Sequence, residues 1–339
     1  MNRIVLIGNG FDLAHGLKTR YEDFINWYLD HRTDNSGILY TEKIRDYDIS
    51  IDYTDMGLIH KTMREYSPFL KTILKRVATK GWVDIENEYY ALLIQNSQNL
   101  HSRPFDSQIV VEPQKLNIQL DHLKYMLIEY LKIEVEKRKT ELIQSIKEKI
   151  FRPIIKKEIA VANCSNISHS EYAPEHIMLL NFNYTQTEHH YYDSCSNLQV
   201  NHIHGSLNDV SGVIFGYGDE LDSGFEMLKS MKNNEYLRNM KSIRYLEADN
   251  YRKMLDFIEL GPFQICIMGH SCGNSDRTLL NTLFEHRFCI SVKPYYYQKK
   301  DKTDNYLELV QNISRNFTDM KLMRDRVVNK TYCEPLVSQ

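Results

Sequence analysis

The fold is decided by residues 3–12, which read RIVLIGNGFD. The apolar run at residues 4–7 is typical of a central strand in a parallel sheet that is covered on both faces. Gly8 and Gly10 follow directly and predict a tight turn into a helix, where a phosphate could rest on free backbone amides. The pattern is not a full GxGxxG, because Leu13 takes the place of the third glycine. A tight turn that binds no ligand is therefore the alternative.

The composition is that of an ordinary globular protein. With 339 residues, 42% hydrophobic and 26% charged, the chain is long enough for one large domain with an insertion, or for two domains. A net charge of -3 gives none of the basic excess that nucleic-acid binding requires. The six cysteines form no CxxC pair, so we predict no metal site. No signal peptide or membrane-spanning run is visible, and we expect a cytoplasmic protein without a membrane partner.

The pattern changes along the chain. Residues 31–170 are mainly helical and charged, whereas strands return from about residue 175 and alternate with helices. The later strands are predicted at residues 176–182, 198–203, 212–215, 263–268 and 287–296, with helices at 276–286 and 304–317. Such alternation predicts an α/β fold with a mainly parallel sheet. We predict a nucleotide-binding core from residues 1–30 and 171–339, with residues 31–170 as a large helical insertion.

Residues 113–150 carry the clearest helical pattern. Apolar residues recur every three or four positions, Pro113 suits a first helical turn and Pro153 would stop the helix. We predict a single helix of roughly 35 residues, longer than globular helices usually run. It could pair with a second subunit to give a homo-oligomer, or pack on the protein's own core.

Polar residues follow two of the later strands. Residues 181–185 read NFNYT, and ligands bind at the carboxyl ends of strands in open α/β sheets, although asparagines are also common turn formers. Residues 201–206 read NHIHGS, where alternation places His202 and His204 on one face of a strand. A histidine beside a glycine is well placed as a general base. A structural role is the common alternative, and a metal site would need ligands that this segment lacks.

Residues 269–276 read GHSCGNSD and follow another apolar strand. Their small side chains and exposed amides suit a second site for phosphate or ribose. The first five residues also fit the GxSxG pattern of serine hydrolases, with Ser271 as the nucleophile. That pattern needs a helix immediately after the serine, whereas residues 273–276 predict a loop before the next helix.

Together, these segments resemble the AbiH family of bacteriophage abortive infection proteins. The opening block reads GNGFDLAHGLKT over residues 8–19, and Tyr21 and Phe24 follow it. The later blocks are similar at residues 81–86 (GWVDIE), 183–185, 204–206 and 269–271. The resemblance covers nearly the whole chain and implies a role in defence against phage.

AbiH proteins in turn resemble sirtuins, whose Rossmann-like core binds NAD. This resemblance implies that Asn183 and His204 are catalytic. It also implies a cofactor-binding role for Gly8, Asn9, Gly10, Phe11, Asp12, Thr19, Gly205, Gly269, His270 and Ser271. The chain departs from the sirtuin pattern at Asn181 and Thr185, where sirtuins carry Thr and Asp. The zinc-binding cysteine module of the protein deacylases is missing, which favours a stand-alone NAD-cleaving effector.

The main hypothesis is therefore an effector that hydrolyses NAD to nicotinamide and ADP-ribose, with the pyrophosphate on the turn at Gly8 and Gly10. A non-catalytic module that senses a nucleotide and signals to a partner is the first alternative, favoured by Thr185. A serine hydrolase built on Ser271 is the second. NAD is the expected substrate or ligand, and no metal is expected.

Three acidic residues near these blocks have open roles. Asp12 either contacts ribose or caps the first helix. Asp84 is expected to cap the helix that follows it, with Trp82 as a hydrophobic anchor. A role for Glu86 at the mouth of a binding pocket is the less favoured interpretation.

Overall fold

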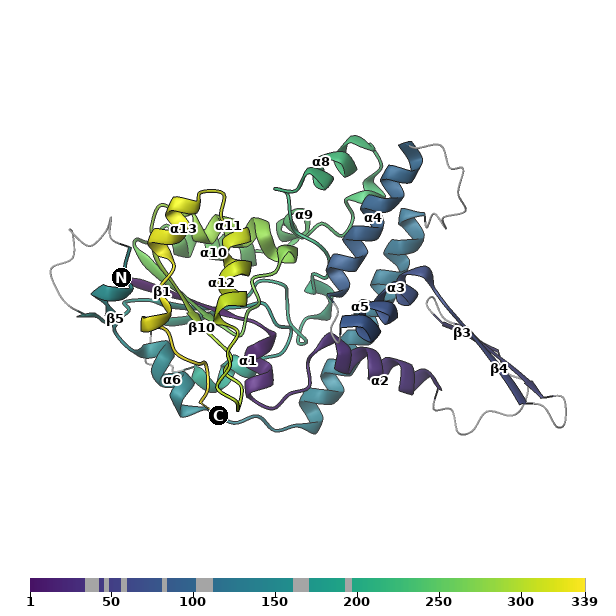
Figure 1. Cartoon of the computed structure of the whole chain (residues 1–339), viewed down its shortest axis with the longest axis horizontal. Coiled ribbons are helices and arrows are strands. Elements are labelled where there is room, and N and C mark those ends of the chain that lie inside the picture. Colours follow the sequence, from purple (N-terminus) through teal and green to yellow (C-terminus); the bar gives the residue numbers. More distant parts are fainter. Residues whose placement is uncertain are drawn as a thin grey trace.

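A five-stranded parallel sheet forms the centre of the α/β part of the protein (Figure 1). The computed structural model describes residues 1–33, 43–45, 49–55, 60–80, 84–101, 112–160, 171–192 and 197–338. The sheet consists of β1 (Asn2–Ile7), β7 (Ile177–Asn181), β8 (Leu198–His202), β9 (Phe263–Met268) and β10 (Cys289–Tyr295). Its strand order is β10-β9-β1-β7-β8, and every neighbouring pair is parallel. The predicted α/β class with a mainly parallel sheet is confirmed, and the opening strand is the central one.

Helices cover both faces of this sheet (Figure 1). One face carries α10 (Asn250–Ile258), α11 (Arg277–Phe284), α12 (Tyr306–Arg315) and α13 (Met320–Arg326), and the other carries α1 (Asn9–Ala14) and α6 (Gln144–Phe151). In β1, Ile4 and Leu6 pack toward the first layer, whereas Val5 and Ile7 pack toward the second. All four side chains are completely buried, which explains the uninterrupted apolar run.

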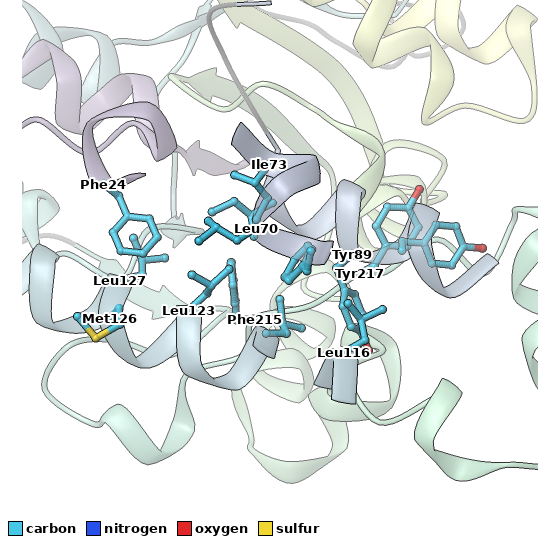
Figure 2. Close-up of a cluster of buried hydrophobic side chains, with 14 of the residues drawn as sticks. Phe24, Leu70, Ile73, Tyr89, Leu116, Leu123, Met126, Leu127, Phe215 and Tyr217 are labelled. Carbon is cyan, nitrogen blue, oxygen red and sulfur yellow. The ribbon is translucent and has the colours of Figure 1, made fainter. Parts of the chain in front are cut away.

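A second hydrophobic core lies beside the sheet. It is built mainly by α2 (Tyr21–Thr33), α3 (Pro68–Lys80), α4 (Ile85–His101), α5 (Pro113–Lys137) and α8 (Ser223–Ser230). Figure 2 shows Phe24, Ile73, Tyr89 and Leu123 of the first four helices converging with Phe215 from the later chain. The short helix α9 (Lys241–Arg244) follows Met240, another member of this core. The division of the chain at residues 30 and 170 stays a prediction.

The single helix predicted over residues 113–150 is wrong. The structure has two helices, α5 and α6, which are separated by residues 138–143. Arg138 and Ile143 at the break both have extended backbone angles. The physical reason is that the two apolar stripes serve different cores. Leu116 to Leu131 of α5 belong to the helical core, whereas Ile146 and Ile150 of α6 pack under the sheet.

Two strand predictions also need correction. The supposedly helical residues 31–170 contain an antiparallel sheet of β2 (Lys43–Arg45), β3 (Ile49–Asp55) and β4 (His60–Tyr66). They also contain the short strand β5 (Ile154–Ile155), which pairs with β6 (Glu171–Tyr172) just beyond them. The alternation of Ile49, Ile51 and Tyr53 with polar residues was the missed signal. Conversely, residues 212–215 form no strand, because Ile214 bonds to the backbone of His204 in a loop and joins no ladder.

Candidate functional site

The carboxyl ends of β1, β7, β8 and β9 open into one cleft with a volume of about 490 Å³. Parts of α4 and α5 complete its wall. Of the residues selected from the sequence, the cleft is lined by Gly8, Asn9, Gly10, Asp12, Thr19, Asn183, His204, Gly269, His270 and Ser271. Segments from both ends of the chain therefore meet where open parallel sheets bind their ligands.

Two of the selected residues lie outside the lining of the cleft. Phe11 is completely buried, and its ring lies 4.7 Å from the ring of His15 and 5.5 Å from that of Tyr191. Gly205 has a φ of +79°, and a Cβ there would lie 2.4 Å from the carbonyl oxygen of Gly212. Gly205 therefore allows the turn that carries the neighbouring His204.

The two glycine turns pack directly against each other. A Cβ on Gly10 would lie 2.8 Å from the Cα of Gly269, and a Cβ on Gly269 would lie 2.1 Å from the backbone nitrogen of Phe11. The N–H of Gly10 donates to the carbonyl of Gly269 at 2.8 Å. Close approach of two backbones thus explains the glycines here, and the Gly10 amide that we expected to hold a phosphate already has a protein partner.

Side-chain hydrogen bonds tie the strand ends to the first turn. The Asn183 amide nitrogen donates to the carbonyl of Gly8 at 3.0 Å, and the Asn183 backbone N–H donates to the side chain of Asn181 at 2.8 Å. At the rim, the Thr19 hydroxyl donates to the Asn9 side chain at 2.5 Å. Asn183 and the glycine turn therefore form one connected wall of the cleft.

The Asp12 side chain is bonded to the segment after β7. The N-cap of α1 is Gly8 and no side chain caps this helix, so the capping alternative for Asp12 is wrong. One carboxyl oxygen, Oδ2, accepts a hydrogen bond of 2.5 Å from the Thr185 hydroxyl. The other oxygen, Oδ1, is buried without a hydrogen-bond partner in the described chain. Burial raises the pKa of Asp12 to about 6.

A buried ionic network, which we call the cleft network, forms another part of the wall. Lys241 Nζ lies 3.0 Å from Glu86 Oε2 and 2.8 Å from Asp276 Oδ1. The same Asp276 oxygen is 3.3 Å from His204 Nε2, and Oδ2 is 3.5 Å from His270 Nε2. All five side chains line the cleft, and Lys241 is only 1% exposed.

The network sets the charge of each member. Burial alone would raise the pKa of Asp276, but Lys241, His204 and His270 together outweigh burial and hold that pKa well below its usual value. Burial raises the pKa of Glu86, and Asp276 adds to this shift although Lys241 opposes it. Burial also lowers the pKa of His204, and Lys241 lowers it further. Asp276 is therefore ionised and His204 is a neutral base at pH 7.

Comparison with known protein families identifies the chain. The family model described as bacteriophage abortive infection AbiH matches residues 4–297. The chain belongs to the AbiH family. No curated protein matches the chain. Of the AbiH blocks quoted above, residues 81–83 lie outside the described residues, whereas Glu86, Asn183 and His204 line the cleft.

The structure also decides between roles proposed for several AbiH residues. Asp84 accepts a hydrogen bond from the backbone N–H of Asn87 at 3.0 Å, which confirms that it caps α4, whereas Trp82 lies outside the described residues. His202 pairs with Glu188 at 2.9 Å and does not line the cleft. In the described part of the chain, no group of three potential ligands gathers for a metal, and no helix is long and apolar enough to span a bilayer.

The serine nucleophile is not supported by the local geometry. After Ser271, the chain forms a loop and then a turn of 3-10 helix at Asn274–Asp276 before α11 begins. Among the described residues, the Ser271 hydroxyl forms no hydrogen bond with His204, and the Nδ1 of His270 accepts from the backbone N–H of Cys272 at 3.0 Å. The helix needed directly after a nucleophilic serine is absent there.

Sequence reasoning missed Lys241 and Asp276 and undervalued Glu86. Lys241 follows no strand and belongs to no glycine turn, so no local pattern marks it. Asp276 belongs to the segment at residues 269–276 and begins a predicted helix, but no chemical role is predicted for it. Asp276 could have been selected by its place after the carboxyl end of an apolar strand, where polar residues face the crevice. Lys241 is recognisable only from its two carboxylate partners.

Proposed function

We propose that this protein is an abortive infection effector with a sirtuin-like core that binds NAD in the cleft and hydrolyses the nicotinamide–ribose bond. The observation that carries the proposal is the position of the cleft. Numbered along the chain, the strands of the sheet have the order 5-4-1-2-3, which is the order of the first five strands in Rossmann-type dinucleotide-binding folds. Such folds bind dinucleotides beside the first strand, where the order reverses.

A second cleft makes room for an extended ligand. It has a volume of about 510 Å³ and shares Gly10, Arg20 and the turn at residues 269–271 with the first. Tyr295, Tyr296 and Tyr297 contribute to its lining, and aromatic side chains suit a nucleobase. The adenosine half of NAD would lie there, with the nicotinamide half in the first cleft. Because the Gly10 amide is already bonded, the positive charge for the pyrophosphate comes from the exposed Arg20.

The cleft network is suited to cleavage of an N-glycosidic bond. The bond from ribose C1′ to the nicotinamide nitrogen breaks, and its electrons neutralise the pyridinium, so the leaving base needs no proton. Positive charge develops on the ribose, and the ionised Asp276 favours it electrostatically. Water adds to C1′ and gives its proton to the neutral His204. Asp276 accepts from His204 Nε2–H and thereby holds the imidazole in one orientation.

The test compares two histidines at opposite ends of the strands: His204 follows the carboxyl end of β8, and His176 precedes the amino end of β7. His204→Ala should reduce nicotinamide release from NAD by roughly 10²–10⁴-fold, the usual worth of a general base. His176→Ala is the control, because His176 is exposed and precedes β7 at the edge away from the cleft. Both variants should be assayed as purified protein and in phage-infected cells, so that an activating signal is present. Unchanged NAD consumption in His204→Ala would exclude His204 from the mechanism.

A nucleotide sensor is the second candidate, and the composition of the cleft wall favours it. Leu127 and Leu131 of α5 line the cleft beside Glu86 of α4, so a bound nucleotide would contact the helical part of the protein directly. A sensor would bind NAD without releasing nicotinamide, even in infected cells. Calorimetric binding combined with the nicotinamide assay therefore separates the two functions.

A further inference from the structure

The loop between α1 and α2 carries two residues that line the cleft. Residues 15–20, which we call the α1–α2 loop, contain no helix or strand. Thr19 lines the first cleft, and Arg20 lines both clefts. Arg20 is exposed, and no ion pair joins it to a carboxylate of the described residues. An arginine on such a loop binds a phosphate more tightly if its backbone is already fixed, because less conformational entropy is lost on binding.

Both backbone groups of Lys18, in the middle of this loop, are bound by side chains of α5. The Tyr130 hydroxyl donates to the Lys18 carbonyl at 2.6 Å, and Glu134 Oε1 accepts from the Lys18 N–H at 2.7 Å. Tyr130 and Glu134 lie one turn apart on α5 and are only 5% and 6% exposed. We call these two side chains the α5 clamp. Because the clamp is shielded from water, loss of either bond leaves a polar group poorly satisfied and loosens the loop.

The helical core supports the α5 clamp. Arg138, one turn after Glu134, pairs with that carboxylate and donates to the carbonyl of Gly16 at 3.4 Å. The ring of Tyr130 lies 5.3 Å from that of Trp27 in α2, and both side chains pack in the helical core. Through these contacts, the position of the α1–α2 loop depends on the packing of the helical core.

We propose that Tyr130 and Glu134 are positioning residues, which hold Arg20 where it binds the pyrophosphate of NAD. Neither of the two lines either cleft, so both act through the α1–α2 loop and touch no ligand. The affinity of the cleft for NAD then depends on the packing of α5, and the helical core controls nucleotide binding. This inference rests on the proposed binding of NAD but not on its hydrolysis.

A double-mutant cycle tests whether Tyr130 acts through Arg20. Tyr130→Phe keeps the packing of the ring and removes only the donor to Lys18, and calorimetry should show a roughly fivefold loss of NAD affinity. Arg20→Gln should cost roughly tenfold or more, because a charge-assisted bond to phosphate is lost. The double variant should bind NAD no more weakly than Arg20→Gln, since the clamp then has no arginine to position. Losses that add in the double variant would overturn the proposal.

Glu134 gives a second test, which does not depend on the folding of Tyr130→Phe. Glu134→Gln keeps an oxygen that accepts from the Lys18 N–H and should retain most of the NAD affinity, whereas Glu134→Ala should lose roughly fivefold. Equal losses in these two variants would overturn the role of this hydrogen bond. Tyr125→Phe is the control on the same helix, because Tyr125 is 58% exposed, and it should bind NAD like wild-type protein.

The outcomes separate this inference from the proposed function. Wild-type protein that does not bind NAD rejects both. Binding of NAD without release of nicotinamide, together with non-additive losses, supports the α5 clamp while hydrolysis fails. Nicotinamide release that depends on His204, together with additive losses, rejects only the clamp.

Discussion

Two buried ionic networks lie on the same sheet, and only one of them lines the cleft. The inner network consists of Arg3, Glu158, Gln264, Ser291 and Lys293, whose side chains are all buried. Arg3 donates to the backbone carbonyls of Ile150 and Arg152 at the end of α6, each at 2.7 Å. Glu158 accepts from Gln264 at 2.9 Å and also pairs with Lys293.

The two networks are alike in burial and in composition, since each has a lysine bound to a carboxylate at the centre. They differ in position. The cleft network lies beyond the carboxyl ends of the strands, whereas the inner network begins at Arg3 in the amino half of β1 and contributes nothing to either cleft. Buried charge therefore does not by itself identify a functional site. Only a network at the carboxyl ends of the strands can reach a ligand, because the cleft opens there.

The largest effect is expected from replacing one carboxylate by an amide in each network. Asp276→Asn should reduce nicotinamide release by roughly 10²–10⁴-fold, because an amide no longer stabilises positive charge or orients His204. Glu158→Gln is the counterpart in the inner network and should leave the turnover of folded protein unchanged. Rates are normalised to the folded fraction measured by circular dichroism. Equal losses in both variants would contradict the distinction between the two networks.

Removal of the lysine of the inner network should affect stability alone. Lys293→Met removes the lysine bound to Glu158 and leaves only Arg152, whose Nη2 lies 3.9 Å from Glu158 Oε1. Breaking a buried pair in this way costs about 3–5 kcal/mol. Lys293 is 1% exposed, so water cannot compensate for the missing charge. Urea unfolding measures the free energy, with Lys300→Met at an exposed position as the control. A loss below about 1 kcal/mol, as for a surface pair, would contradict burial of this network.

The parallel sheet could be predicted from the sequence because each of its strands has a local sequence pattern. The apolar runs of β1, β7 and β9 and the glycine turn after β8 are visible in short windows. The residues that follow these strands, Gly10, Asn183 and His204 among them, lie in one cleft. These residues could be predicted because the carboxyl ends of parallel strands share one edge of the sheet.

Other features depend on contacts between distant segments and could not be predicted locally. Lys241 joins Glu86, 155 positions earlier, to Asp276, 35 positions later. The chain breaks between α5 and α6 because their apolar stripes face different cores. Both stripes have the same helical period, so the periodicity does not reveal the break. The contact of Gly10 with Gly269 also joins distant segments and could not be predicted locally. A glycine that binds phosphate and a glycine that packs against another turn look identical in sequence.

Asp12 extends the comparison to a buried carboxyl without a cation. Its pKa is raised from 3.8 to about 6, so between these values the folded protein binds more protons than the unfolded chain. The free energy of unfolding should therefore fall by about 3 kcal/mol as the pH rises from about 4 to about 7. Asp12→Asn should lack this component, which urea unfolding of both proteins at several pH values would isolate. A difference between the two proteins that does not change with pH would contradict the raised pKa.

The smallest effect is expected from the Tyr245 hydroxyl, which lies 3.1 Å from His204 Nε2. The ionised Asp276 can only accept a hydrogen bond, so Nε2 carries a proton and Tyr245 can only accept from it as well. Asp276 then orients His204 without help, and Tyr245→Phe should cost about 1 kcal/mol, or roughly fivefold in nicotinamide release. If Tyr245→Phe instead reduces release as much as Asp276→Asn, the hydroxyl must donate to an unprotonated Nε2. The proton of His204 would then lie on Nδ1, and the cleft network would bind the ring without orienting it as a base.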